Sequence, residues 1–385
     1  MRRIYLTKNE LGFFFALFMW TVKDLLSCMR IVQLSTAQII LLTLLPMGVF
    51  CACIAGRIER SQKTLVFGLT VLIAMVAYLI SGVVNFLFFL LAAAAAKDIN
   101  KDKILCFMCR VMTLTLVAIT VIFFLHSFVV GQWATFSTAT GGGAVRPSFY
   151  MTHPNAYSEW VFSAVLLLWY RYYYILGIQG RCFLLLCCSV YIAIVPKTQT
   201  SATTLVIVMI FDILNHFASE RINRRIRYGV FFASIGFSYI SMIFYDRFFL
   251  FPILNEFLSG RLYMGSSAYK IFGIPLLGQR IQIGQRLMYY GGTSYYIRQL
   301  ALDNTYIRLL ICSGVLVTVL FLAVCFLLLH RAEQKGDSII AVWLVALFFY
   351  GISEPIITDV VYAAPLLFCG ELYFKNAKSG LVRRK

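Results

Sequence analysis

Residues 305–329 read TYIRLLICSGVLVTVLFLAVCFLLL, and Arg308 is the one charged residue among them. An α-helix needs about 20 predominantly apolar residues to cross the hydrocarbon of a bilayer, so this stretch is long enough to span a membrane. Apolar stretches of similar length recur along the 385 residues, of which 61% are hydrophobic and 13% charged. Because a soluble domain carries about 25% charged residues, we expect an integral membrane protein.

The polar breaks between apolar stretches predict about twelve transmembrane spans. Backbone groups at bilayer depth have no water to bond, so the spans should be helices and the fold class all-α. The N-terminal stretch is interpreted as a retained span, because no small-residue cleavage site precedes Lys23 and Asp24. The whole chain, 1–385, is expected to form a single polytopic membrane domain. The predicted spans are 10–28, 36–55, 64–81, 83–96, 104–129, 154–175, 182–196, 202–218, 228–245, 305–329, 338–352 and 356–374.

The distribution of positive charge predicts the orientation in the membrane. Lys and Arg are enriched in cytoplasmic loops, and with the N-terminus inside, 22 of the 34 fall in inner segments. Both termini are then cytoplasmic. The net charge of +18 does not indicate nucleic-acid binding, because the basic residues lie in short loops between spans.

Two predicted outer loops, 131–153 and 246–304, are longer than connections need to be. Loops of this length are uncommon unless they carry function. The second holds six Lys and Arg residues against three acidic ones. A cationic outer surface over a bilayer suits an anionic ligand such as a lipid-linked phosphate.

The sequence shows no motif for a metal, a cofactor or a nucleophilic hydrolase. P-loop, HExxH and GxSxG patterns are absent, and the four His residues are dispersed. Cys106 and Cys109 form a CxxC, but there is no second pair and no nearby His. We therefore expect neither a metal nor a cofactor.

The segment 146–155, RPSFYMTHPN, places Arg146, His153 and Asn155 at the outer mouth of a span that Pro154 can begin. A helix N-terminus attracts anions, and a cationic neighbour strengthens the attraction. Ordinary capping of the helix explains the same residues equally well, so both interpretations stay open.

Three short motifs mark the large outer loop and the mouth of the next span: SGRL at 259–262, LGQR at 277–280 and LDNTY at 302–306. Glycine permits tight turns, and Arg261 can fork onto a diphosphate. Asp303 or Asn304 can hold sugar hydroxyls or cap the following helix, and capping is expected in either case.

Acidic and basic residues near bilayer depth form a further set of candidates. Glu354, in ISEP, is a functional candidate if it lies at that depth and an ordinary turn residue if it is solvated. For Lys23, Asp24, Arg110 and Arg308, which lie near or within spans, we expect internal pairing or snorkelling.

The order of these motifs resembles the Wzy-type polysaccharide polymerases of bacterial capsule, exopolysaccharide and O-antigen pathways. An HPN motif begins a mid-chain span. The motifs SGR, GQ and DNxY then follow across one outer loop, and an SE motif lies near the C-terminus. Together these motifs cover about residues 140–355. The resemblance is to the O-antigen polymerase and ligase superfamily. It implies a GT-C-like, metal-independent glycosyltransferase at the outer face of the bacterial cytoplasmic (inner) membrane.

The resemblance also implies substrates and partners. Such an enzyme transfers the growing glycan from undecaprenyl diphosphate to the next lipid-linked repeat unit. Its partners would be undecaprenyl-diphosphate-linked oligosaccharides, membrane lipids, and a chain-length regulator and a flippase of the same pathway.

Residue roles follow from the same resemblance. Arg261 would bind the donor diphosphate, and Arg146 and His153 would line the same cavity. The acceptor's base is left open among His153, Asp303 and Glu354. Lys197 stands where relatives often have a Ser-Arg pair, and it would act as a point charge without the guanidinium fork. Residues shaping the cavity or orienting sugars would be Asn155, Gln279, Asp303, Asn304 and Tyr306.

Two other functions fit the same frame. An O-antigen-type ligase shares the donor but uses a different acceptor, which no motif identifies. A lipid-linked oligosaccharide flippase or other transporter would have a similar number of spans, but with internal repeats and polar residues near the midplane. The polar residues here gather in the outer loops, which favours chemistry there.

Overall fold

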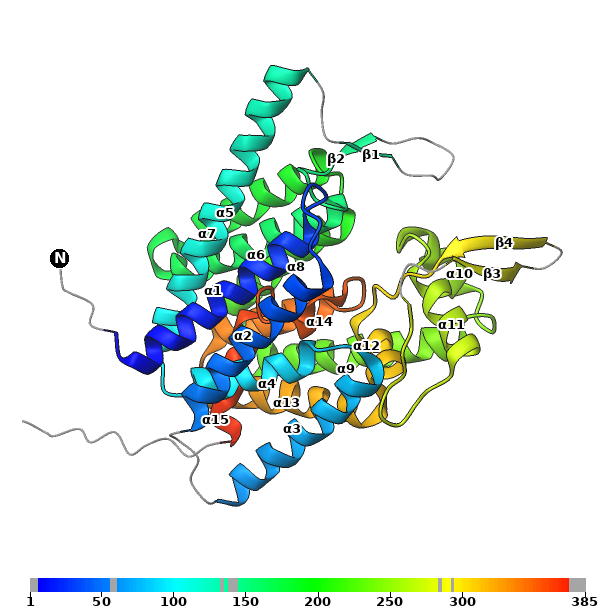
Figure 1. Ribbon diagram of the computed structural model, residues 1–385. Helices are drawn as coiled ribbons and strands as arrows, with labels where there is room; N and C mark the ends of the chain where they lie inside the picture. Colours follow the sequence, from blue (N-terminus) through cyan, green and yellow to red (C-terminus); the bar gives the residue numbers. More distant parts are fainter. Residues whose placement is uncertain are drawn as a thin grey trace, which may run out of the picture. The chain divides into compact units, whose positions relative to one another are not determined.

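The computed structural model describes residues 6–55, 61–131, 135–137, 145–282, 286–291 and 294–373, and it is dominated by helices (Figure 1). The α-helices are α1 (Lys8–Cys28), α2 (Thr36–Ala55), α3 (Gln62–Ser81), α4 (Asn85–Ala96), α5 (Lys101–Val130), α6 (Pro154–Arg171), α7 (Tyr173–Ile194), α8 (Gln199–Phe217), α9 (Glu220–Phe244), α10 (Leu250–Phe257), α11 (Arg261–Phe272), α12 (Thr305–Arg308), α13 (Gly314–Gln334), α14 (Ser338–Tyr350) and α15 (Gly370–Tyr373).

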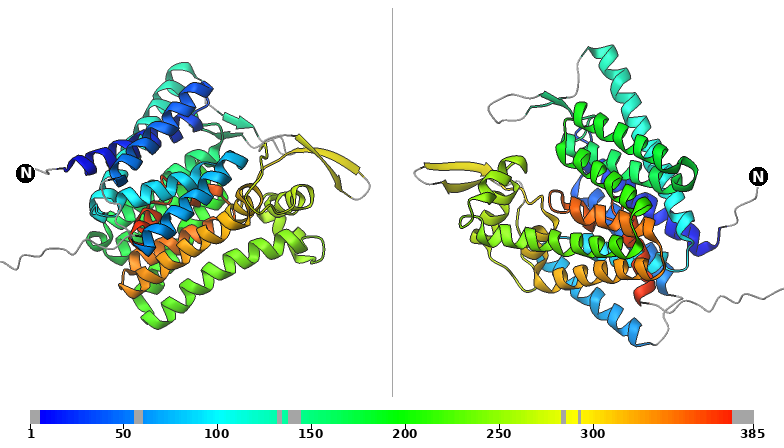
Figure 2. Two further views of the ribbon diagram at one scale, coloured as in Figure 1. Left: turned by 60° about the horizontal axis from the view of Figure 1, so that its bottom comes forward. Right: turned by 180° about the vertical axis from the view of Figure 1, so that it is seen from behind.

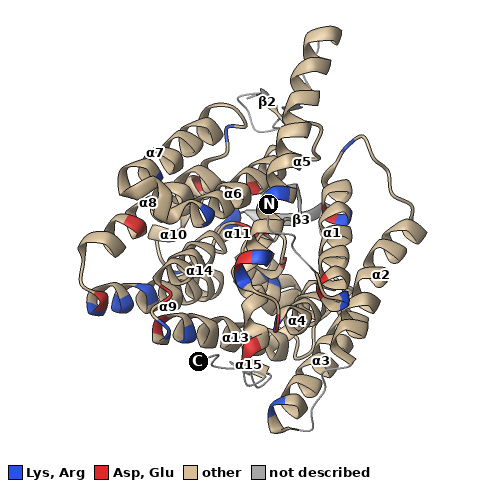
Figure 3. Cartoon of the chain, turned by 90° about the vertical axis from the view of Figure 1, so that its left-hand side faces the viewer, with Lys and Arg blue, Asp and Glu red and all other residues tan. Residues whose placement is uncertain are grey.

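Eight helical segments among the described residues are long and apolar enough to cross a bilayer. Figure 3 shows that most of their length carries no charged residue. The structure is therefore compatible with a helical polytopic membrane protein, as the sequence predicts. The eight are α1, α2, α3, α5, α7, α8, α9 and the continuous run from α12 to α13, Thr305–Gln334.

Helices α4 and α14 are too short for a straight crossing. They have 12 and 13 residues, or roughly 20 Å at 1.5 Å per residue. Most of their residues are buried, as expected for a helix that is apolar all round. The stretches 83–96 and 338–352 therefore form helices, but interior ones.

The predicted span at 356–374 is wrong. The structure has two 3-10 turns there, η2 (Pro355–Thr358) and η3 (Ala364–Cys369), followed by the single turn of α15. Pro355 and Pro365 begin these turns and cannot donate a helical hydrogen bond. The apolar residues of this stretch are buried, which explains why composition alone suggested a span.

The break between the predicted spans 154–175 and 182–196 lies earlier in the chain than the sequence suggests, at Tyr172. Helix α6 ends at Arg171 and α7 begins at Tyr173, with a kink at Gly177 (φ 60°, ψ 178°). Arg181 does not mark a loop, because its Nη1 donates to the Tyr173 carbonyl at 2.7 Å and its guanidinium lies over the Tyr173 ring.

The long loops contain structure that the all-α prediction did not include. In 131–153, strand β1 (Thr135–Ser137) pairs antiparallel with β2 (Val145–Pro147). In 246–304, α10 and α11 precede a ribbon of β3 (Arg286–Gly291) and β4 (Ser294–Gln299). The triplet Gly141–Gly143 and the basic C-terminal residues lie outside the described residues.

The chain divides into two compact units. Unit 1 comprises 1–69, 88–202 and 360–385, and unit 2 comprises 70–87 and 203–359. Within unit 2, α9, α13 and α14 run side by side (Figure 2). Tyr306 of α12 anchors to this bundle, donating its hydroxyl to the Phe348 carbonyl at 2.6 Å. The single-domain description stays a prediction.

Candidate functional site

Three motifs that lie far apart in the sequence meet in unit 2. Arg261 Nε donates to Asp303 Oδ2 at 3.2 Å, and its Nη2 donates to Glu354 Oε1 at 2.6 Å. The side chains of Arg261 and Glu354 are only 10% and 3% exposed, whereas that of Asp303 is 36% exposed. We call these three residues the Arg261 cluster.

Local sequence explains how each member is positioned. Ser259 and Gly260 both adopt positive φ after α10, and this turn places Arg261 at the first residue of α11. The Asn255 side chain accepts the Tyr263 backbone N–H at 3.0 Å and so fixes the start of that helix. Glu354 follows α14 and directly precedes Pro355.

The two carboxylates of the cluster stabilise the charged form of Arg261. Burial acts to lower the pKa of Arg261, but the carboxylates of Glu354 and Asp303 outweigh it and hold the pKa above its usual value. The guanidinium is therefore a fixed positive charge. Of the two interpretations of Glu354, the solvated turn residue is wrong, because the side chain is buried and ion-paired.

Asn304 and Tyr306 lie beside this cluster but face the interior. Asn304 Oδ1 accepts the Ile307 N–H at 3.1 Å, which confirms the expected cap, and its Nδ2 donates to Ser238 Oγ at 2.8 Å. Tyr306 is 1% exposed. These contacts are structural, and sugar binding by either residue stays a prediction.

Gln279 holds the loop after α11 against a break in the following helix. Its Nε2 donates to the carbonyls of Phe272 and Ile311, and its backbone N–H donates to the Cys312 carbonyl. The break consists of the π-turn η1 (Leu309–Ser313) followed by Gly314 at φ 87°. Contact of Gln279 with a substrate stays a prediction.

The loop and the break fit so closely that both glycines at the contact are required. The N–H groups of Val315 and Leu316, freed by the break, donate to the carbonyls of Pro275 and Leu276. A Cβ on Gly314 would lie 2.3 Å from the Gly278 nitrogen, and one on Gly278 would lie 2.7 Å from the Cys312 carbonyl oxygen.

The remaining predicted residues belong to unit 1. Arg146 Nη1 donates to the Lys197 carbonyl at 3.2 Å, so these two positions lie together. His153 caps α6: its Nδ1 accepts the Asn155 N–H at 3.0 Å, and Pro154 begins the helix as predicted. Capping is therefore confirmed, while anion binding at this end stays a prediction.

Strained backbone marks the same segments in both units. Among the described residues, four that are not glycine have positive φ: Phe149 (52°), Tyr150 (60°), Lys197 (53°) and Ser259 (55°). All four lie in or beside segments selected from the sequence, namely 146–155, the Lys197 position and the SGR motif. Such strain gathers at functional sites and supports a functional hypothesis.

Sequence reasoning missed the aromatic support of segment 146–155. Phe149 stacks on Tyr157 with ring centroids 3.8 Å apart, and the Tyr150 hydroxyl bonds His126 Nδ1. His126 lies on α5, and no spacing in the sequence connects it to this segment.

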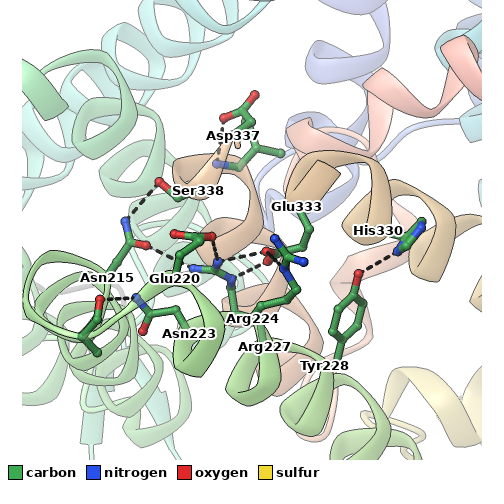
Figure 4. Close-up of polar contacts among 12 residues, drawn as sticks. Asn215, Glu220, Asn223, Arg224, Arg227, Tyr228, His330, Glu333, Asp337 and Ser338 are labelled. Atoms are coloured by element: carbon green, nitrogen blue, oxygen red, sulfur yellow. Dashed lines mark hydrogen bonds and ion pairs between the residues drawn. The ribbon is translucent and has the colours of Figure 1, made fainter. Parts of the chain in front are cut away.

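A second charged cluster in unit 2 also escaped prediction. Arg227 of α9 donates through Nε and Nη2 to Glu333 of α13 at 2.5 and 3.0 Å (Figure 4). Its remaining nitrogen, Nη1, donates to Asn215 Oδ1 at 3.1 Å, and Nη2 also reaches Glu220 at 2.8 Å. We call Arg227, Glu333, Asn215 and Glu220 the Arg227 cluster.

Within the described ranges, no group of three or more His, Cys, Asp or Glu residues could hold a metal ion. Comparison with known proteins adds no further assignment: no family model, curated protein or solved structure matches the chain.

Proposed function

We propose that this chain is a polysaccharide polymerase that joins undecaprenyl-diphosphate-linked oligosaccharide repeat units at the outer face of the bacterial cytoplasmic membrane. The observation that carries the proposal is the Arg261 cluster. Its members come from the SGR, DNxY and SE motifs, which the resemblance groups on sequence alone. Positions 261, 303 and 354 meet through bonds of 3.2 and 2.6 Å.

The reaction needs a fixed cation near the leaving group. The bond between the sugar's anomeric carbon and the phosphate oxygen breaks, and the acceptor hydroxyl oxygen forms a new bond to that carbon. The diphosphate departs with the bonding electrons. A preorganised guanidinium in a water-poor site stabilises the negative charge that develops there.

The acceptor hydroxyl must also lose its proton. Asp303 and Glu354 are carboxylates beside the proposed phosphate site, so either can accept a proton close to the departing diphosphate. Asp303 is the more accessible, at 36% against 3% exposure. We therefore assign the base to Asp303, and Glu354 to holding the guanidinium in place.

The test is an assay of purified protein with lipid-diphosphate-linked repeat units, without added nucleotide sugar or metal. The wild type should produce a ladder of polymer. Arg261→Lys keeps the positive charge but loses the two-pronged hydrogen-bonding geometry of the guanidinium. This variant should form much less polymer than the wild type while it stays folded in the membrane. Arg224→Lys, at a half-exposed arginine of α9, is the matched control and should polymerise normally.

Each competing function predicts a different product. A ligase would attach chains to another acceptor once, without a ladder. A transporter would move the lipid between leaflets of liposomes without joining units. A wild-type ladder from Arg261→Lys would contradict the assignment of Arg261 even if the protein is a polymerase.

A further inference from the structure

A large groove in unit 1 is not used by the proposed polymerase site. It has a volume of about 760 Å³ and lies between α1 and α5, with Arg171 at the end of α6 beside it. This volume is within the range of about 300–1,000 Å³ that small-molecule sites occupy. The apolar walls are formed by Leu11, Phe14, Phe15 and Phe18 of α1 and Phe107 of α5.

One end of the groove is cationic. Arg171 Nη1 contacts Cys106 Sγ at 2.7 Å. Arg110 lies four residues beyond Cys106 on α5, and residues at this spacing share a helix face. Arg110, Arg171 and Cys106 all line this groove.

Neither arginine is neutralised by a protein carboxylate. In the part of the chain that the structure describes, Arg110 and Arg171 form no ion pair, although both line a mostly apolar groove. Two other charged residues line the groove: Lys103, which pairs with Glu10 at 2.7 Å, and Asp102, which keeps its negative charge while it accepts the Tyr170 hydroxyl at 3.2 Å. The lining therefore carries three cationic side chains and one carboxylate. Internal pairing, expected for Arg110 from the sequence, is therefore not the explanation.

We propose that this groove binds an anionic diacyl phospholipid, whose phosphate lies between Arg110 and Arg171 and whose acyl chain lies along the aromatic side chains of α1. Arginine forks match phosphate oxygens in geometry and charge. Basic pockets between transmembrane helices are a known way of holding lipid headgroups. A soluble anion would leave the apolar walls uncovered, so the lipid is the better fit.

The groove is distinct from the motif residues of its own unit. Helix α6 begins beside His153 and ends at Arg171, 18 residues later, which is roughly 27 Å along the axis. In the predicted topology this end faces the cytoplasm, so the phospholipid would come from the inner leaflet.

The test is native mass spectrometry of the intact purified protein titrated with phosphatidylglycerol or phosphatidylcholine. The wild type should retain phosphatidylglycerol in preference to phosphatidylcholine. Arg110→Gln and Arg171→Gln should each weaken phosphatidylglycerol retention by about tenfold, because a charge-assisted bond to phosphate is lost. Arg224→Gln, outside the groove, should retain it as the wild type does.

A variant that fills the groove tests the acyl-chain position independently of charge. Leu11→Trp should reduce phosphatidylglycerol retention while leaving both arginines intact, provided that the protein stays monodisperse in size-exclusion chromatography. Arg110→Lys, which is expected to fold and keeps the charge, should bind with intermediate strength.

Three results would overturn the proposal. Equal retention of both phospholipids by the wild type would remove the headgroup preference. Unchanged retention in both Arg→Gln variants would remove the assigned site. Displacement of phosphatidylglycerol by undecaprenyl phosphate at lower concentration, or by millimolar inorganic phosphate, would assign the groove to a polyprenyl or a free anion instead.

Discussion

Unit 2 contains two clusters in which an arginine meets carboxylates, and they are built differently. In the Arg227 cluster Glu333 accepts two bonds from Arg227, and both side chains are at most 3% exposed. Glu220, which is 55% exposed, accepts a third bond from the same arginine. In the Arg261 cluster two carboxylates accept one bond each, and that of Asp303 is 36% exposed. The first holds its arginine in a buried bidentate pair, whereas in the second no carboxylate accepts more than one bond from the arginine.

The backbone around the two clusters also differs: it is regular helix at Arg227 and Glu333 and turn beside Arg261 and at Glu354. Arg227 and Glu333 both lie within regular helices, α9 and α13. Arg261 follows two residues of positive φ, and Glu354 lies in a turn between α14 and η2. A bidentate pair on two helices stabilises helix packing, whereas single bonds at the ends of helices can be exchanged for bonds to a ligand. The comparison therefore favours a packing role for Arg227 and supports the role proposed for Arg261.

The largest expected effect is the loss of stability in Arg227→Met. Removing the cation leaves Glu333 buried without its main partner, and breaking a buried pair costs about 3–5 kcal/mol. The midpoint of thermal unfolding in detergent should fall sharply. The double variant Arg227→Met with Glu333→Met should recover much of that loss, because no buried charge is left. A single variant as stable as the wild type would remove the distinction between the clusters.

A smaller effect is expected for Gly314→Ala, which acts where the loop after α11 packs against the break before α13. The new Cβ would overlap the Gly278 nitrogen at 2.3 Å, and the backbone already has φ 87°. Strain and overpacking together should cost about 2–5 kcal/mol. Proteolysis should then cut the 273–282 loop sooner, while the Arg227 cluster stays intact.

The control is Gly229→Ala on α9, where a Cβ would meet nothing within 4 Å. Because alanine favours the helix over glycine, this variant should gain about 0.5–1 kcal/mol. Equal stability of the two alanine variants would show that the break at Gly314 does not hold the loop.

How far the sequence predicted these features depends on whether the interaction is local. Pro154 as the first residue of α6 and Asn304 as a helix cap follow from short-range rules, and both are confirmed. The positions of Arg261, Asp303 and Glu354 in the sequence do not predict that their side chains touch. Only the resemblance groups these three residues. The Arg227–Glu333 pair joins positions 106 residues apart. Neither a short-range sequence rule nor the resemblance predicts this pair.

Errors in the fold have the same origin. The stretch 356–374 has the composition of a span, yet Pro355 and Pro365 divide it and its apolar residues are buried in the interior. The predicted span 305–329 is present as the helical run Thr305–Gln334. Composition does not reveal its break at Gly314, where loop residues 275–279 supply hydrogen bonds that the broken helix lacks. Hydropathy measures the apolar content of a segment. It does not show whether the apolar side chains contact lipid or other parts of the protein.

The smallest expected effect separates the two carboxylates of the Arg261 cluster. Asp303→Asn should change stability by less than about 1 kcal/mol, because Asp303 is partly exposed and Arg261 keeps its bond to Glu354. Glu354→Gln should cost about 1–3 kcal/mol, since it weakens a buried, charge-assisted bond. If Asp303 is the base, Asp303→Asn should nevertheless lose far more polymer than its stability loss explains, measured as initial rate at equal amounts of folded protein. Glu354→Gln should lose activity roughly in step with its stability. The reverse pattern would make Glu354 the base and Asp303 a surface partner of the arginine.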